Sequence, residues 1–191
     1  MEYLIRDING IDSGKYAEIS ALLPAETAER IKRLKPDDRK RTLAGRILLS
    51  DLIFKLYGKT EFNVKIGKNG KPELDFCYFN ISHSGDYAVC AVSDVPVGID
   101  IERISGFKKR ERYMLFSPEE SEFVNECESE KRFFTLWTMK EAYIKAIGGT
   151  LRDAGKITLV KDGRPSAEYK GYLLKTEYRD GYALTVCEKA R

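Results

Sequence analysis

An internal repeat with a spacing of 93 residues limits the fold of this chain more than any other feature of its sequence. The repeat consists of matched residues that follow one another in the same order in both halves. These matches are Asp7 with Asp100, Ile8 with Ile101, Leu22 with Leu115, Thr42 with Thr135, and Gly70 with Gly163. Several matches at one spacing indicate two similar structural units. We therefore divide the chain into an N-terminal half, residues 1–93, and a C-terminal half, residues 94–191.

Both halves have the same order of expected elements, with a strand followed by helices and then by further strands. In the N-terminal half we expect strands at 3–8, 62–66, 79–82 and 87–93, and helices at 26–34 and 38–57. In the C-terminal half we expect strands at 97–104, 157–161, 171–178 and 182–188, and helices at 118–127 and 131–147. Gly58 and Gly148 follow the long helices, where glycine is a common helix stop. The pattern predicts an α+β fold, a pseudo-twofold duplication of two similar αβ halves with a cleft between them.

Charge and cysteine content narrow the classes of function. The chain carries 33 Lys and Arg residues against 30 Asp and Glu residues, and its net charge of +3 does not by itself indicate nucleic acid. Basic residues gather at 30–46 and acidic residues at 119–130. This asymmetry is typical either of a basic site for a phosphorylated or acidic partner or of two solvated helix faces. The four cysteines form no C-x-x-C pair and no apolar run is long enough to span a membrane, so we expect a reduced, cytoplasmic protein.

Two carboxylates in the segment VGIDIERI form the first candidate site. Asp100 and Glu102 are two residues apart in an expected strand, so both side chains point to the same face. Such a pair repels itself unless a cation lies between the two groups, and an oxygen-only ligand set suits Mg²⁺ better than zinc. The pair predicts a magnesium site, with a solvated strand edge as the alternative.

The segment LWTMKEAYIKAIGG adds a polar stripe on an expected helix. Trp137, Glu141 and Lys145 are spaced four residues apart and share one helix face. The alternative is an ordinary surface Glu–Lys pair, which contributes little to stability. At the spacing of 93, Glu141 and Lys145 correspond to Leu48 and Leu52. A polar site in one half with an apolar counterpart in the other indicates a single active site.

The segment FNISHSGDYAV contains the only histidine of the chain, His83. Ser82, Ser84 and Gly85 surround it in a polar turn that could place an imidazole or a hydroxyl against a phosphate. The preceding segment, GKNGKPEL, adds Lys71 in a turn suited to close backbone approach. A lone histidine is more often a packing or surface residue, so this segment is not diagnostic by itself.

Four segments in this order, GKPEL, FNISHS, VGIDIE and LWTMKEAYIK, resemble the surfactin-synthetase-type 4′-phosphopantetheinyl transferases. The resemblance implies a monomeric pseudodimer of two αβ halves, in agreement with the repeat. It also implies transfer of the 4′-phosphopantetheine group of coenzyme A to a serine of an apo acyl, peptidyl or aryl carrier protein, with release of 3′,5′-adenosine diphosphate. Mg²⁺, with Mn²⁺ as a substitute, would be the cofactor, and coenzyme A the substrate.

The resemblance further implies a role for each site residue. Asp100, Glu102 and Glu141 would bind Mg²⁺ in the C-terminal half. Glu141, or a water that it orients, would act as the base, and Lys145 would stabilise or protonate the leaving phosphate. The N-terminal half would bind the 3′-phosphate and adenine side of coenzyme A. The implied coenzyme A-binding residues are Lys35, Arg41, Lys71, Pro72, Ser82, His83 and Lys145.

Glu120 matches a further acidic position that the family uses in metal or base chemistry. Ser117, three residues earlier, gives the alternative of a capping box at the start of a helix. Two other functions stay open on the residues alone: a Mg²⁺-dependent nuclease or phosphodiesterase, and an inactive module that binds coenzyme A or a partner for a basic surface. We expect coenzyme A and a carrier protein as partners, and neither nucleic acid nor a membrane.

Overall fold

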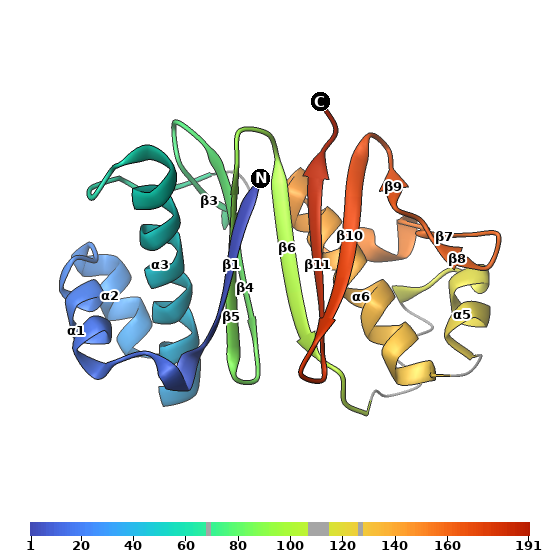
Figure 1. Cartoon of the computed structure of the whole chain (residues 1–191), viewed down its shortest axis with the longest axis horizontal. Coiled ribbons are helices and arrows are strands. Elements are labelled where there is room, and N and C mark those ends of the chain that lie inside the picture. Colours follow the sequence, from blue (N-terminus) through green and yellow to red (C-terminus); the bar gives the residue numbers. More distant parts are fainter. Residues whose placement is uncertain (68–69, 107–114, 126–127) are drawn as a thin grey trace.

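The computed structural model describes residues 1–67, 70–106, 115–125 and 128–191. The strands of both halves lie in the middle of the molecule, and the helices of each half cover the outer side of its own strands (Figure 1). The order along the long axis is therefore helices, sheet, sheet, helices. Within these ranges no helix is long and apolar enough to cross a membrane.

The N-terminal half is built on a three-stranded antiparallel sheet. Its elements are β1 (Glu2–Asp7), η1 (Ile8–Gly10), α1 (Ser13–Ala21), α2 (Ala25–Lys32), α3 (Pro36–Tyr57), β2 (Lys65–Ile66), β3 (Pro72–Glu73), β4 (Tyr78–Ser84) and β5 (Tyr87–Ser93). The strand order in the sheet is β1-β5-β4, and β2 and β3 pair separately. The β4–β5 hairpin carries the FNISHS segment, so this sheet presents it at one edge.

Helix α3 covers this sheet because its sequence defines both ends and an apolar face. It begins with Pro36 in the first turn, where Asp37 and Asp38 suit the positive end of the helix dipole. It ends at Gly58, whose φ of 65° is in the left-handed region that glycine adopts without strain. The residues of α3 in the core of this half are Ala44, Ile47, Leu48, Leu49, Leu52 and Ile53.

The C-terminal half repeats this plan with a four-stranded antiparallel sheet. Its elements are β6 (Val97–Arg103), α5 (Pro118–Asn125), α6 (Ser129–Ile147), η3 (Leu151–Lys156), β7 (Val160–Lys161), β8 (Arg164–Pro165), β9 (Glu168–Tyr169), β10 (Tyr172–Arg179) and β11 (Tyr182–Lys189). The strand order is β6-β11-β10-β9, and α6 packs against β6 and β11. The expected α+β fold of two similar halves is confirmed.

The two halves meet through apolar side chains between their sheets. Val89 and Ala91 of β5 form one core cluster with Ile99 and Ile101 of β6 and with Val186 of β11. All of these side chains are buried. Strand β6 also lies against β4, so the segments FNISHS and VGIDIE are brought together at the junction.

The strand register corrects one detail of the repeat. Asp7, the last residue of β1, lies opposite Tyr87, the first residue of β5. Arg103, the last residue of β6, lies opposite Tyr182, the first residue of β11. The structural counterpart of Asp7 is therefore Arg103 and not Asp100, because the pairing between strands and not residue identity fixes strand register. The Asp7–Asp100 match is three residues out of structural register.

Smaller differences from the expected elements occur outside the two sheets. The sequence does not predict α1, which has no fully buried residue and packs against the core through the partly buried Tyr16 and Ile19. The expected strands 62–66 and 157–161 are reduced to β2 and β7, because each pairs over two residues only. Residues 126–127 of the expected helix 118–127 lie outside the described residues.

Candidate active site

Asp100 is the buried centre of a polar cluster where β4, β6 and α6 meet. Its residue is only 2% exposed. Its Oδ1 atom lies 2.5 Å from Nζ of Lys145 on α6 and accepts a hydrogen bond of 2.7 Å from Oγ of Ser82 on β4. Lys145 also donates to Ser82, over 3.1 Å. One carboxylate oxygen thus joins both halves of the chain.

The other oxygen of Asp100, Oδ2, is buried and has no hydrogen-bond partner among the described residues. A buried polar atom without a partner is uncommon, because losing its hydration costs free energy that no protein contact returns. An oxygen in this state is available to a cation or a ligand donor. This atom is the strongest sign of a missing ligand in the described part of the chain.

Glu102 lies two residues further along β6 and is held by a hydroxyl from β4. Ser84 donates from Oγ to Oε2 of Glu102 over 2.8 Å. Burial raises the pKa of Glu102 and the nearby Asp100 raises it further, whereas hydrogen bonds from Ser84 and Trp137 oppose this rise. The β6 carboxylates are therefore close enough to repel each other.

Among the carboxyl groups of the site, Glu141 has the most strongly raised pKa. Burial raises its pKa from 4.5 to about 7, with further contributions from the negative charges of Asp100 and Glu102, while Lys145 opposes the shift. Its position on α6, one turn before Lys145, follows the helical stripe of the sequence. The site thus contains a carboxyl group that can hold or release a proton near neutral pH.

The donor atoms of this cluster fit Mg²⁺ in kind, since the three carboxyl groups supply oxygen only and Asp100 Oδ2 has no other partner. Their spacing is less favourable. In the described ranges no group of three or more His, Cys, Asp or Glu side chains is arranged so that it could hold a metal ion. The cation that pairs with Asp100 in the described structure is the Lys145 ammonium group. Closure of the carboxylates around a metal would therefore require side-chain movement.

Two basic residues, His83 and Arg41, lie on the β4 side of this cluster. His83 is exposed on β4, and its pKa is lowered first by the protein packed around it and then by the positive charges of Arg41 and Lys145. Arg41 on α3 donates from Nε to the carbonyl of Gly85 over 2.9 Å, and pairs with Asp38. The hairpin turn is thereby fixed to α3. The positive charges that lower the pKa of His83 make this region a favourable environment for an anion.

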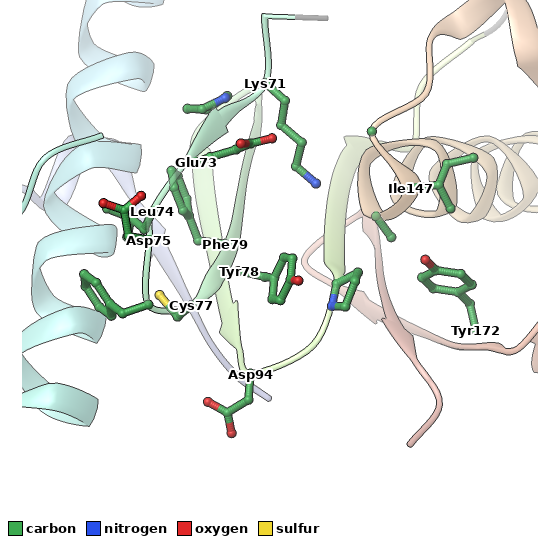
Figure 2. Close-up of a pocket in the computed structure, with 15 residues that line it drawn as sticks. Lys71, Glu73, Leu74, Asp75, Cys77, Tyr78, Phe79, Asp94, Ile147 and Tyr172 are labelled. Carbon is green, nitrogen blue, oxygen red and sulfur yellow. The ribbon is translucent and has the colours of Figure 1, made fainter. Parts of the chain in front are cut away.

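Lys71 and Pro72 line a cleft of about 610 Å³ between the halves. Figure 2 shows Lys71 extending from the N-terminal half, with Ile147 and Tyr172 of the C-terminal half on the facing wall. Nζ of Lys71 lies 2.5 Å from the carbonyl oxygen of Lys145. Burial lowers the pKa of Lys71. The GKP turn therefore reaches the end of α6, directly behind the Asp100 cluster.

Two expected site residues have different surroundings. Lys35 is the exposed residue that precedes α3, more than one helical turn before Arg41. Glu120 is fully buried and forms a capping box, in which Ser117 N donates to its Oε2 over 2.8 Å and its own N–H donates to Ser117 Oγ over 3.2 Å. Its other partners are Lys140 Nζ and the N–H of Leu159. The structure thus supports the helix-cap alternative for Glu120.

The sequence did not indicate a partner for Lys140, and it indicated a phosphate, not a carboxylate, as the partner of the hydroxyls beside His83. Lys140 has no exposed surface and lies on the apolar stripe that Leu136 and Tyr143 define. A lysine at such a position is the one signal that could have revealed a buried partner. Ser84 lies two residues from Ser82 and thus on the same strand face, a spacing that could have suggested a second contact with the carboxylate pair.

A single carboxylate–lysine cluster at the junction of two similar halves defines an enzyme with one active site on a duplicated α+β frame. The family model "4′-phosphopantetheinyl transferase superfamily" matches residues 96–187. The model "4′-phosphopantetheinyl transferase, N-terminal" matches residues 12–95. The chain belongs to the 4′-phosphopantetheinyl transferase family.

Individual relatives agree with this assignment. The chain is 32% identical to a 4′-phosphopantetheinyl transferase of Bacillus subtilis, over 93% of this chain and 87% of the relative. It is 31% identical to the 4′-phosphopantetheinyl transferase Sfp of Bacillus subtilis strain 168, over 87% of this chain and 82% of the relative. It is 37% identical to the 4′-phosphopantetheinyl transferase gsp of Aneurinibacillus migulanus, over 73% of this chain and 62% of the relative.

The expected family is thus confirmed, and with it the expected class of enzyme, a transferase. This family uses coenzyme A as a substrate and acts on carrier proteins. The nuclease and binding-module alternatives are not favoured.

Proposed function

We propose that this chain transfers the 4′-phosphopantetheine group of coenzyme A to a serine hydroxyl of an apo acyl, peptidyl or aryl carrier protein. The single observation that carries the proposal is the buried Asp100, whose Oδ1 is bonded to Lys145 and whose Oδ2 has no partner in the described chain. The Lys145 ammonium group suits a diphosphate, and the unpartnered oxygen of Asp100 suits the metal ion that accompanies it.

Mg²⁺, or Mn²⁺ in its place, would be held by Asp100, Glu102 and Glu141. When bound, the metal would offset the negative charge that grows on the diphosphate as the phosphorus–oxygen bond breaks. The oxygen-only donor set and the repulsion among the three acids support this assignment. A cation among them would oppose the burial and the repulsion that together raise the pKa of Glu141.

Glu141 is the proposed base, directly or through a water that it orients. The attacking serine hydroxyl forms a bond to the phosphorus atom that carries the pantetheine arm and gives its proton to the Glu141 carboxylate. In the metal-free protein burial raises the pKa of Glu141 to about 7, and a cation beside it would favour the ionised form that accepts the proton. The leaving 3′,5′-adenosine diphosphate takes the electron pair of the broken bond.

Lys145 is the proposed partner of that leaving phosphate, which it stabilises by its charge or by donating a proton. Its side chain is partly exposed, at 26%, so it can be reached by a substrate in the junction. Without a ligand, the Lys145 ammonium group pairs with Asp100. Binding of the metal by Asp100 would release Lys145 for the phosphate.

The N-terminal half is proposed to hold the nucleotide end of coenzyme A. Arg41 and His83, with Lys35 as a more distant contributor, would bind the 3′-phosphate, since Arg41 is one of the positive charges that lower the pKa of His83. Lys71 and Pro72 would contact the adenine or the diphosphate from the cleft wall. Ser82 would contact phosphate from its position beside Lys145. We further propose that the enzyme is a cytoplasmic monomer that binds neither nucleic acid nor membrane.

Intact mass spectrometry of apo carrier proteins tests this function. Each carrier of a panel from fatty-acid, polyketide and peptide synthesis is incubated with the enzyme, coenzyme A and Mg²⁺. We expect at least one carrier to gain the mass of one phosphopantetheine group, to lose this gain with EDTA and to regain it with added Mg²⁺. Absence of the mass gain across the whole panel would contradict the proposal.

A further inference from the structure

Strand β4 contacts β6 through polar side chains and not through a backbone ladder. Three alternate residues of β4 take part, and alternation places their side chains on one face of the strand. Asn80 Oδ1 accepts from the N–H of Ile99 over 2.9 Å, and Ser82 Oγ donates to Asp100 Oδ1 over 2.7 Å. Ser84 is the third member of this series.

Ser84 makes two contacts that together fix the direction of its hydrogen. Its Oγ accepts a hydrogen bond of 3.2 Å from the backbone N–H of Arg103. The same Oγ lies 2.8 Å from Oε2 of Glu102. A serine hydroxyl has one hydrogen, and the Arg103 contact uses a lone pair. The hydrogen is therefore directed at the Glu102 carboxylate.

The hydrogen bond from Ser84 to Glu102 differs from the one from Ser82 to Asp100 in what else holds the carboxylate. Asp100 is held by Lys145 as well as by Ser82, so its position depends on a charge pair. Glu102 has a longer and more flexible side chain, and its hydrogen-bonding neighbours Ser84 and Trp137 come from opposite sides of the junction. Ordering a free Glu side chain costs rotamer entropy. A partner that orders it beforehand lowers the cost of binding a ligand.

We propose that Ser84 is a positioning residue that sets the Glu102 carboxylate for binding the divalent metal ion. The inference rests on the proposed function, because Glu102 must be a metal ligand for the position of its carboxylate to matter. In the described structure the Ser84 hydroxyl contacts Glu102 and the backbone of Arg103. It acts through Glu102, as outer partners of metal ligands do in other proteins.

Binding of Mn²⁺, followed by the loss of the free-ion EPR signal in the presence of coenzyme A and without carrier protein, tests this role. Ser84→Ala removes the hydroxyl, and we expect the Kd for Mn²⁺ to rise by about tenfold or more. Ser84→Thr keeps the hydroxyl on a residue that strands accept, and we expect it to restore affinity close to that of the wild type.

Ser93→Ala is the matched control. Ser93 on β5 also donates from Oγ to a carboxylate of the other half, that of Glu188 on β11, and it is more buried than Ser84. Its loss would weaken the junction of the halves in a similar way without touching a proposed metal ligand. We expect the Ser93→Ala enzyme to bind Mn²⁺ with unchanged affinity.

The outcomes separate this role from general stability and from the proposed function. Equal Mn²⁺ affinity in the wild type and in Ser84→Ala, in an enzyme that transfers phosphopantetheine, would overturn the role of Ser84 alone. An equal loss in Ser84→Ala and Ser93→Ala would overturn it as well, since the effect would then come from the junction as a whole. A wild-type enzyme that binds no Mn²⁺ would overturn the metal proposal, and this inference with it.

Discussion

Nζ of Lys140 lies 2.8 Å from Oε2 of Glu120, and neither side chain has any exposed surface. Lys140 also donates to the carbonyl oxygens of Leu115 and Ala154, and Glu120 accepts from the N–H of Leu159. Burial lowers the pKa of Lys140, and the negative charge of Glu120 opposes that shift. The pair thus ties the start of α5 and the chain around η3 to α6, one residue before Glu141.

Breaking this pair should strongly destabilise the protein. We expect Lys140→Met to lower the free energy of unfolding by about 3–5 kcal/mol, because it leaves a buried carboxylate without its cation. Urea denaturation measures this loss. Lys131→Met, which removes an exposed pair with Glu128 on the same helix, should cost at most about 1 kcal/mol. Similar losses for the two variants would contradict a structural role for the buried pair.

Replacement of Glu141 by glutamine should separate catalysis from folding. We expect Glu141→Gln to lower the rate of transfer by about 10²–10⁴-fold, because an amide cannot accept the serine proton. Mass spectrometry of the carrier product gives the rate, and circular dichroism verifies the fold. Glu130→Gln, at an exposed position in the first turn of the same helix, should leave the rate unchanged. Normal transfer by a folded Glu141→Gln enzyme would exclude Glu141 as the base.

Because its pKa is raised in the folded protein, Glu141 should lower the free energy of unfolding at neutral pH. Its pKa is 4.5 in the unfolded reference and about 7 in the folded protein. Between these values the folded protein keeps a proton that the unfolded chain has released, so this residue lowers stability as the pH rises through that window. In EDTA we expect Glu141→Gln to be more stable than the wild type at about pH 8, by on the order of 1 kcal/mol, and the advantage to shrink at about pH 5. Urea unfolding at both pH values checks this, and a variant less stable than the wild type at the higher pH would refute it.

Gly98 on β6 should tolerate no side chain. A Cβ atom there would lie 2.0 Å from the carbonyl oxygen of Ala142 and 2.6 Å from the backbone nitrogen of Ala146, both on α6. Backbone atoms cannot rotate away, so we expect Gly98→Ala to cost about 1–3 kcal/mol or more and to lower Tm by about 2–12 °C. Gly10→Ala, where a Cβ meets nothing within 4 Å, is the control. An unchanged Tm for Gly98→Ala in differential scanning calorimetry would show that α6 can move away from β6.

The sequence predicts the two halves well, because each half carries its own complete pattern of strands, helices and glycine stops. It does not predict how the halves align in register. The match of Asp7 with Asp100 depends on residue identity, whereas pairing opposite Tyr87 and Tyr182 aligns Asp7 with Arg103. This pairing between strands distant in sequence is not encoded in the spacing of similar residues.

The sequence predicts those residues of the candidate site whose side-chain direction follows from the periodicity of a strand or a helix. Asp100 and Glu102 share a strand face, and Glu141 and Lys145 share a helix face, so contact between the two elements was enough to gather them. The partners of Glu120 and Ser84 could not be inferred in this way. Lys140 is 20 residues from Glu120 in the chain, and Ser84 is 18 residues from Glu102. Such contacts depend on how elements pack across the core.

The polar contacts between β4 and β6 have a consequence for how the chain could be divided. Within the described residues, every strand ladder and every backbone–backbone hydrogen bond stays inside one half. A cut between Asp94 and Pro96, in the turn that joins β5 to β6, would therefore leave both sheets whole. The molecule suits fragment complementation, in which two separately produced pieces would regain activity only by re-forming the side-chain contacts of their shared face.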